Sequence, residues 1–351
     1  MPEVNGGFFA VDDVGQISNP RGDSVLGLQR FTQNGRVAGH LYTYRSGVWT
    51  DITGPANTLF VDGTNGSDNN NGTVLARAFA TIQAAITAAL AGYTIYIKAK
   101  AMAAGATDPV DYAETLTIPA GKSRLRLVGL SEGPAQGNVP QIKKGSGATA
   151  LLTVRSPGCY VGGLGFNGAG ATGGGILLDD DGSTKTAFGT VIEACHFKNC
   201  KGSTATSAAT GGAIQLGGAP WQVTIRGNRF YKNVGGIVLL NTTNSVPQDI
   251  EIEDNRFVGS AGAVDCDIYL AGGSGPGAGL SIVRNVFGPF PALGSGAVLR
   301  WMDLTGADEG IVAGNYFAED KTFGATGTGA KVPTTVLLSG NYDEGGLIAR
   351  V

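Results

Sequence analysis

Two pairs of acidic residues have a spacing that carbohydrate chemistry could use. Glu251 and Glu253 lie two positions apart, and Asp265 and Asp267 repeat that spacing further along the chain. If each stretch is a β-strand, the two carboxylates of a pair lie on one face, about 7 Å apart. Enzymes that cleave glycosidic bonds place two carboxylates roughly 5 to 9.5 Å apart. These four residues are therefore candidate catalytic acids, and a solvated strand face is the simpler alternative.

Aromatic and basic side chains near these acids could bind sugars. Trp221 follows a Gly-Gly-Ala-Pro stretch, Tyr269 lies beside the second acidic pair, and Trp301 follows a short apolar run. Aromatic rings stack on sugar faces, and we expect Arg284 to lie near Asp265 and Asp267. Packing in the core or between subunits is the alternative function of each ring.

Metal ligands are not evident. The run Asp179, Asp180 and Asp181 could bind a hard cation such as calcium, but it lacks the spacing of an EF-hand, so a solvated turn is expected. The chain has four cysteines, at positions 159, 195, 200 and 266. Their spacing does not fit a zinc site, so they are expected to be buried thiols, and His196 is expected to be structural. We expect no metal and no cofactor.

A motif that contains an Asn and a Phe repeats along the second half of the chain. Copies lie at residues 223–230, 250–257, 280–287 and 310–317, and a shorter one lies at 336–342. The Asn recurs at positions 228, 255, 285, 315 and 341, at spacings of 27, 30, 30 and 26 residues. A unit of this length, with an alternating strand and a turn residue, is typical of a stacked solenoid.

Stacking would bring equivalent side chains of successive copies into contact, because rungs lie about 4.8 Å apart. We expect Phe230, Phe257 and Phe287 to lie on one another, together with the apolar residues before them. We expect the Asn column to be a ladder at a corner, since Asn tolerates a left-handed backbone and its amide can bond to the next Asn. The repeat is therefore a scaffold feature.

A second strand follows each copy of the motif. These strands are predicted at residues 174–178, 212–216, 236–240 and 267–270, and a third strand is expected to close each rung. Val238 and Leu240 would point outward if Ile237 and Leu239 point inward, which predicts an exposed apolar ridge. On this ground we expect side-by-side association as a parallel homotrimer.

Composition limits the class of protein. Gly accounts for 58 of 351 residues, only 15 % of residues are charged, and the net charge is −3. This composition indicates a turn-rich β protein, and the lack of a basic cluster argues against nucleic acid as a partner. No signal peptide and no apolar run of membrane-spanning length is visible, so we expect synthesis in the cytoplasm and no membrane insertion.

Residues 1–54 differ from the rest and contain no copy of the motif. Residues 41–52 read as a β-hairpin around Ser46 and Gly47, and Asn34 with Gly35 offers another tight turn. His40 lies in this segment and is not expected to be catalytic. The segment is too short for a large core, so we predict an attachment and oligomerisation module at 1–54 and a solenoid body at 55–351.

A helix is predicted at about residues 79–91. Phe79, Ile82, Ile86 and Leu90 recur at helical spacing, and Gly92 is placed to end the helix. An amphipathic helix directly before a solenoid covers the apolar end of the first rung. We therefore expect this helix to be the N-terminal cap.

The stretch at residues 60–86, with its Asp62-Gly63, Ser67-Asp68 and Asn71-Gly72 pairs and the FATIQAAI run, resembles a known family when read with the repeats. It is similar to the pectate-lyase-like right-handed parallel β-helix superfamily, and most similar to its phage tailspike and tail-fibre members. The resemblance covers roughly residues 58–351. It implies an all-β solenoid with a capping helix behind a virion-attachment module, and it is specific for fold but not for chemistry.

Three functions are consistent with these features. The first is a trimeric phage tailspike that attaches to tail or portal-proximal proteins through residues 1–54 and recognises host surface polysaccharide. The second is a polysaccharide hydrolase or lyase on the same fold, and the third is a virion β-helix, for example on the capsid, without affinity for carbohydrate. The absence of a decisive carboxylate pair favours recognition or structure over catalysis.

Overall fold

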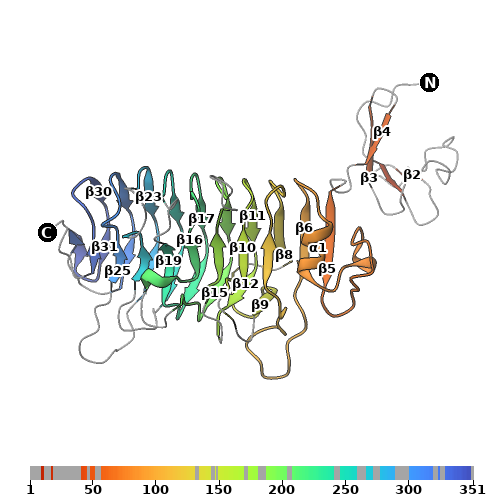
Figure 1. Cartoon of the computed structure of the whole chain (residues 1–351), viewed down its shortest axis with the longest axis horizontal. Coiled ribbons are helices and arrows are strands. Elements are labelled where there is room, and N and C mark those ends of the chain that lie inside the picture. The colour runs from red at the N-terminus through yellow and green to blue at the C-terminus, as the bar shows by residue number, and fades with distance from the viewer. Residues whose placement is uncertain are drawn as a thin grey trace. The chain divides into compact units, whose positions relative to one another are not determined.

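Three long parallel sheets wind together into a right-handed parallel β-helix, which forms the main body of the chain. In this computed structural model the described residues are 9–11, 17–18, 41–45, 48–51, 57–130, 134–143, 147, 149–169, 173–180, 187–203, 208–240, 246–258, 266–271, 277–288, 300–318, 323–324 and 329–348. Figure 1 shows the rungs succeeding one another from β5 towards β30. The predicted fold class is confirmed.

Each sheet takes one strand from successive rungs, and the sheets are numbered here in the order in which the chain passes through them from β7 onward. Sheet I contains β7 (Leu116–Ile118), β10 (Leu152–Val154), β13 (Ile176–Leu178), β16 (Ile214–Leu216), β19 (Gly235–Leu239), β22 (Cys266–Tyr269), β25 (Arg300–Asp303), β28 (Phe323–Gly324) and β29 (Ala330–Lys331). Sheet II contains β5 (Thr58–Asp62), β6 (Thr94–Lys98), β8 (Arg126–Leu130), β11 (Tyr160–Gly162), β14 (Val191–Glu193), β17 (Thr224–Arg226), β20 (Glu251–Glu253), β23 (Leu280–Val283), β26 (Gly310–Ala313) and β30 (Val336–Ser339). Sheet III contains β9 (Gln141–Lys143), β12 (Gly165–Asn167), β15 (His196–Lys198), β18 (Arg229–Tyr231), β21 (Arg256–Val258), β24 (Val286–Phe287), β27 (Tyr316–Phe317), β31 (Tyr342–Asp343) and β32 (Gly346–Leu347).

The repeated motif spans two strands and the corner between them. In the copy at residues 223–230, β17 of sheet II precedes the Asn, and β18 of sheet III follows it. The predicted register is confirmed, because Ile225 pairs with Ile252, and Ile252 with Ile282, in adjacent rungs. A rung of three strands results.

The Phe of each motif lies in the interior, on the Phe of the next rung. The stacked rings belong to Phe166, Phe197, Phe230, Phe257, Phe287 and Phe317, with centroids 4.6 to 5.1 Å apart and interplanar angles of 10° or less. The rung spacing of about 4.8 Å imposes this parallel arrangement. The column is buried along its length, so it contributes apolar area to every rung.

The Asn residues form the predicted ladder. The side-chain amide of Asn228 donates to the side-chain oxygen of Asn255 at 3.0 Å, and the same bond links Asn255 to Asn285, Asn285 to Asn315, and Asn315 to Asn341. Each of these oxygens also accepts from the backbone N–H of the preceding Asn. All five side chains are buried, so the ladder satisfies polar groups that water cannot reach.

The expected left-handed backbone at the Asn residues is wrong. The positive φ falls on the residue before each Asn, namely Gly227 (63°), Asp254 (55°), Arg284 (55°), Gly314 (64°) and Gly340 (58°). The chain turns the corner at that preceding residue, and the Asn then directs its amide into the core. Asn is thus required for its hydrogen bonds and not for its backbone conformation.

Helix α1 (Ile82–Ala88) caps the first rung. Ile82, Ala85 and Ile86 are fully buried and belong to the same core cluster as the strands of the β-helix. The helix is shorter than predicted, with Ala89 as its C-cap, and Leu90 is 63 % exposed. Gly92 has a φ of 77° but lies in the turn after the helix, so its role as the helix terminator is wrong.

Acidic side chains tie the loop at residues 62–72 to this cap. The carboxylate of Asp68 accepts hydrogen bonds from the backbone N–H groups of Ala80 and Thr81 and from the Thr81 hydroxyl. Glu114 accepts from the N–H groups of Ile82 and Gln83. These bonds satisfy donors that a helix start leaves without a partner, and they give the Asp68 of the family-like stretch a structural role.

The exposed apolar ridge predicted on sheet I is wrong. Val238 is fully buried beneath the short 3-10 helix η3 (Ala208–Thr210), in a small cluster with Ala208 and Cys266, and Leu240 is partly buried against it. A segment from an earlier rung therefore covers this face. The ridge no longer supports a trimer, which remains a prediction.

The N-terminal part forms a unit of its own, Met1–Thr58, and the β-helix forms the second unit, Leu59–Val351. In the first unit, β1 (Phe9–Val11) pairs with β2 (Ile17–Ser18) and with β3 (Leu41–Arg45), all antiparallel. The predicted hairpin is confirmed, because β3 pairs with β4 (Val48–Asp51) and Arg45 lies opposite Val48. The predicted turn at Asn34 and Gly35, and His40, lie outside the described residues.

The four cysteines are free and buried, as predicted. Burial raises the pKa of Cys159, Cys195 and Cys200 to about 12, so these thiols remain protonated and unreactive at neutral pH. Among the described residues no helix has the length and apolar character needed to cross a membrane.

Candidate functional site

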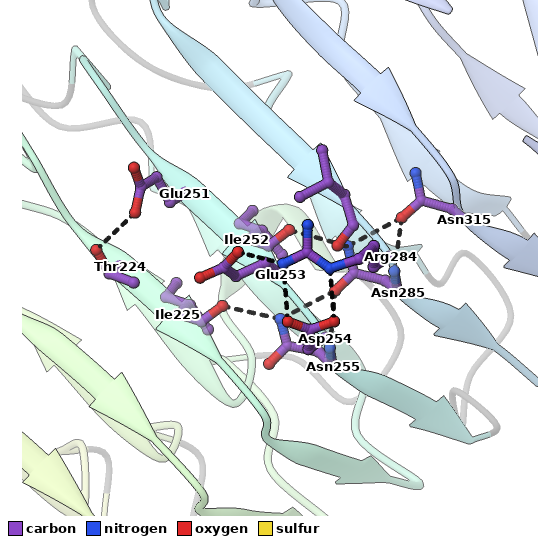
Figure 2. Close-up of polar contacts among 11 residues, drawn as sticks. Thr224, Ile225, Glu251, Ile252, Glu253, Asp254, Asn255, Arg284, Asn285 and Asn315 are labelled. Carbon is purple, nitrogen blue, oxygen red and sulfur yellow. Dashed lines mark hydrogen bonds and ion pairs between the residues drawn. The ribbon is translucent and has the colours of Figure 1, made fainter. Parts of the chain in front are cut away.

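The outer face of sheet II carries a row of charged side chains. In β20, Ile252 is fully buried while Glu251 and Glu253 point away from the core, as the alternation along a strand requires. Glu251 is exposed and its carboxylate accepts a hydrogen bond from the Thr224 hydroxyl of β17 at 3.1 Å. The first predicted acidic pair therefore lies on the outer face of the strand, with Glu251 exposed and Glu253 partly buried (Figure 2).

Arg284 holds Glu253 but does not contact Glu251. Its guanidinium lies 2.6 Å from Glu253 and donates two hydrogen bonds of 2.9 Å to Asp254 (Figure 2). These bonds, to Asp254 first and then to Glu253, raise the pKa of Arg284 above its usual value. The two glutamates of the pair thus have different surroundings, one bound to a cation and one bound to a hydroxyl.

The row continues toward earlier rungs. Glu193 of β14 accepts from Arg226 at 3.1 Å and from the Tyr160 hydroxyl at 3.2 Å. The Arg126 guanidinium lies 4.1 Å from the centre of the Tyr160 ring, within the range of a cation–π contact. Burial, and then the Glu193 carboxylate, raise the pKa of Tyr160. Each charge in this part of the row therefore has an opposite or aromatic partner.

A shallow pocket opens at the start of the same strands. It is lined by Phe188, Trp221, Gln222, Gln248 and Asp249 and has a volume of about 260 Å³. Phe188 is 38 % exposed, and Trp221 is partly exposed while its indole N–H donates to the carbonyl of Val246 at 3.1 Å. This hydrogen bond fixes the orientation of the Trp221 ring before any ligand binds.

The rungs align these pocket residues. Phe188, Trp221 and Gln248 each lie three residues before a strand of sheet II, and Trp221 forms a parallel bridge with Gln248. The N–H of Gly189 donates to the Trp221 carbonyl at 2.8 Å, so Phe188 and Trp221 belong to adjacent rungs. Their side chains form an aromatic strip one rung apart.

The backbone at the pocket departs from the pattern of its neighbours. Gln222 and Asp249 have φ values of 54° and 52°, whereas glycine takes the equivalent left-handed position at Gly158, Gly189 and Gly279. A left-handed conformation costs roughly 1–2 kcal/mol for a residue with a side chain. Arg124 takes the same left-handed position outside the pocket, with a φ of 58°, so the strain by itself does not identify a binding site.

The pocket and the charged row form one continuous surface. Gln222 precedes Thr224 by two residues, and Asp249 precedes Glu251 by two, so the pocket borders the Thr224 and Glu251 side of the row. A ligand seated in the pocket would have Glu251 at its edge. This surface is called the sheet II face below.

The second predicted acidic pair does not join this site. Asp267 lies in β22 of sheet I and is 5 % exposed, and Asp265 lies outside the described residues. Arg284, expected beside these two residues, instead binds Glu253 and Asp254. Asp267 therefore lies on a different sheet from Glu251 and Glu253.

Two of the proposed sugar-binding aromatics lie elsewhere. Trp301 is fully buried, 4.9 Å from the Phe317 ring and 6.0 Å from the Phe323 ring, so it offers no face to a ligand and that assignment is wrong. Tyr269 is partly buried in sheet I against the Cys266 cluster, and burial, followed by the Asp303 charge, raises its pKa. Trp221 alone of the three lies in the pocket.

A buried polar cluster on sheet III has a structural arrangement. The Lys198 ammonium pairs with Asp108 of the loop between β6 and β7, and both His196 and Lys198 are almost fully buried. Burial, followed by the Lys198 charge, lowers the pKa of His196 to about 4. The cluster fastens a loop to the outer face of the early rungs, which confirms the structural role expected for His196.

The aspartate run at 179–181 does not form a cation site in the described residues. Asp179 accepts two hydrogen bonds from the Arg155 guanidinium, at 2.9 and 2.8 Å, while Asp181 lies outside the described residues. No group of three or more His, Cys, Asp and Glu side chains in the described part of the chain could hold a metal ion.

Sequence reasoning missed Phe188, Gln222, Gln248 and Asp249. A signal was present, because Trp221 lies seven residues before Asn228 and Gln248 lies seven before Asn255. The same offset from Cys195, which takes the Asn position one rung earlier, leads to Phe188. Alignment of the repeats on the Asn column would have placed the rings of Phe188 and Trp221 side by side.

Comparisons with known proteins support the fold. The native crystal structure of the GH136 lacto-N-biosidase from Eubacterium ramulus matches with a TM-score of 0.51 and 10% identity, over 82% of this chain and 56% of that one. Its selenomethionine derivative matches with a TM-score of 0.47 over the same shares. The chain thus spans little more than half the length of the enzyme that it resembles. No protein-family model and no curated protein sequence matches the chain.

Proposed function

We propose that this chain is a carbohydrate-recognising virion protein, a phage tailspike that binds a host surface polysaccharide on its sheet II face. The observation that carries the proposal is the pocket in which Phe188 and Trp221 present aromatic surface beside Gln222, Gln248 and Asp249. Sugars bind through this combination, because their C–H faces stack on aromatic rings while their hydroxyls bond to amides and carboxylates. A volume of about 260 Å³ suits one sugar unit rather than a long oligosaccharide.

The rest of the assembly follows from the resemblance to tailspikes. Residues 1–54 would attach the protein to the phage tail or to portal-proximal proteins, and the mature location would be the virion after synthesis in the host cytoplasm. A parallel homotrimer belongs to the same proposal. Light scattering of the full chain tests it, and a monomer at micromolar concentration would contradict it.

The test of recognition compares binding of the full chain and its variants to host capsule or lipopolysaccharide. Trp221→Ala and Phe188→Ala should each weaken binding tenfold or more, because stacking of one ring contributes on the order of 1–3 kcal/mol. Tyr342→Ala is the matched control, since Tyr342 is 51 % exposed on sheet III, away from the pocket. Circular dichroism and melting temperature verify that the variants are folded.

Two outcomes would overturn recognition by this pocket. One is unchanged binding in both pocket variants. The other is adsorption of virions that lack the protein at the rate of complete virions.

A second candidate, polysaccharide hydrolysis, has one observation in its favour. Glu251 and Glu253 lie two residues apart on one exposed face, a Cα separation of about 7 Å, and only Glu253 is bound to a cation. Hydrolysis gives its two carboxyls different roles, and these two side chains have different partners. Release of reducing ends that Glu251→Gln and Glu253→Gln both abolish would support hydrolysis, and activity retained in both would remove these residues from catalysis.

A further inference from the structure

The pocket has a distinctive charge. Among its lining residues Asp249 is the only ionisable one, and the others are two amides and two aromatic rings. In the part of the chain that the structure describes, the Asp249 carboxylate makes no hydrogen bond or ion pair, and the residue is exposed. An unpaired negative charge therefore faces any ligand that enters.

The nearest cations of the sheet II face do not compensate this charge. Arg226 is bound by Glu193, and Arg284 is bound by Glu253 and Asp254. Arg226 is the last residue of β17 and Arg284 directly follows β23, whereas the pocket lies at the strand starts. Arg124 occupies the same turn as Asp249 but in a rung before β11, and it is not part of the lining.

The position of the Asp249 carboxylate is set by the neighbouring rung. A Cβ atom on Gly279 would lie 2.4 Å from Asp249 Oδ1, so the carboxylate lies against a surface that only glycine provides. The backbone N–H of Asp249 donates to the carbonyl of Ala278 at 2.9 Å, which ties the residue to that rung. Gly279 is thus a positioning residue for the acid.

From this arrangement we infer that the pocket selects uncharged sugars, hexoses and N-acetylhexosamines, and rejects uronic acids and sulfated sugars. The inference deepens the proposed function and rests on it. The Asp249 carboxylate accepts hydrogen bonds from sugar hydroxyls, which gives charge-assisted bonds that are stronger than neutral ones. A ligand carboxylate or sulfate in the same place would meet a like charge, and like-charge contacts suppress wrong partners.

This selectivity has a consequence for chemistry. β-Elimination requires a uronic acid, because its carboxylate makes the neighbouring C–H acidic, and cleavage then proceeds through loss of that proton and of the glycosidic oxygen. A pocket that rejects uronates cannot place such a substrate. If the sheet II face is catalytic at all, the reaction is hydrolysis, in which water adds across the glycosidic bond.

The experiment measures binding of the full chain to an array of neutral, uronate-containing and sulfated oligosaccharides at low ionic strength, followed by titration calorimetry with the bound glycans. We expect the bound glycans to be neutral and to bind at least tenfold more tightly than uronate analogues of equal length. Asp249→Asn, which keeps the shape and tolerates the left-handed backbone, should reduce that ratio at least fivefold. Asp343→Asn, an acid on sheet III, is the matched control and should leave the ratio unchanged.

The outcomes separate the two proposals. Binding to uronate or sulfated glycans that Trp221→Ala abolishes would overturn the selectivity and retain the proposed function. An unchanged ratio in Asp249→Asn would also overturn the role of this acid. No binding to any glycan, or binding that both Trp221→Ala and Phe188→Ala leave intact, would overturn the proposed function itself.

Discussion

The side-chain amide of Asn255 lies 3.0 Å from the side-chain oxygen of Asn285, in the next rung. The same amide donates to the Ile225 carbonyl at 2.9 Å, and the Asn255 oxygen accepts from both the backbone and the side chain of Asn228. One side chain therefore makes four hydrogen bonds, three to the preceding rung and one to the next. The buried polar groups of the rungs in this ladder therefore find hydrogen-bond partners in neighbouring rungs, as expected for a solenoid.

Replacement of Asn255 by Ala should lower the free energy of unfolding by about 3 kcal/mol, because it leaves buried donors and acceptors without partners. Asn341→Ala is the comparison, since Asn341 is the last member of the ladder among the described residues and its side chain makes three such bonds. Its effect should be smaller. Urea unfolding followed by circular dichroism measures both, and equal losses would contradict a role for ladder position.

Phe257→Ala should destabilise the β-helix by about 4 kcal/mol. The ring is fully buried between the rings of Phe230 and Phe287, at 4.6 and 4.8 Å, so its removal opens a cavity and ends the column. Tyr316→Ala, at a position 43 % exposed on the same sheet, should change stability by about 0.5 kcal/mol or less. A loss below 1 kcal/mol for Phe257→Ala would show that the column repacks.

The corner residue before the Asn allows a test of backbone strain alone. Gly227 has a φ of 63°, and the nearest heavy atom to a Cβ built there is 4.0 Å away, so Gly227→Ala should cost about 1 kcal/mol without a steric clash. Ala194 occupies the same corner one rung earlier with a φ of 52°. Ala194→Gly should therefore stabilise the protein, by up to about 1 kcal/mol. Melting temperatures that move in the same direction for both variants would refute this explanation.

Acidification should destabilise the early rungs through His196. Its pKa falls from 6.5 to about 4 on folding, because burial and Lys198 disfavour the charged ring. The folded state thus binds fewer protons, and the stability that His196 contributes is complete above pH 6.5 and is lost as the pH falls to about 4. The loss amounts to roughly 3 kcal/mol.

His196→Gln should flatten this part of the pH profile. Urea unfolding of both proteins between pH 7 and pH 4 measures the difference in their free energies of unfolding. The contributions of other titrating groups cancel in this difference because both proteins contain them. The wild-type protein should lose more stability than the variant over this range. Parallel profiles would show that His196 does not titrate there.

Local pattern alone was sufficient to predict the scaffold. The spacing of the Asn and Phe residues predicts the rungs, their register and both interior columns, because a parallel stack places equivalent positions of each unit on one another. Alternation also predicts that Glu251 and Glu253 share the outer face of their strand, since successive side chains point to opposite sides. The hairpin at residues 41–52 and the capping helix follow from equally local signals.

Only the tertiary structure decided what covers each face and what meets across the rungs. Val238 has an outward position by alternation but is covered by Ala208 from the preceding rung, and Trp301 packs on the rings of Phe317 and Phe323. Asp267 lies on a different sheet from Glu251. Arg284 lies at the corner after β23, and its guanidinium binds Glu253 of the preceding rung. Alternation determines the direction of a side chain within one strand, whereas burial and pairing depend on loops whose length differs from rung to rung. The pocket of Phe188 and Trp221 also depends on the tertiary structure. Its residues come from stacked rungs, so side chains two dozen or more residues apart in the chain lie next to one another.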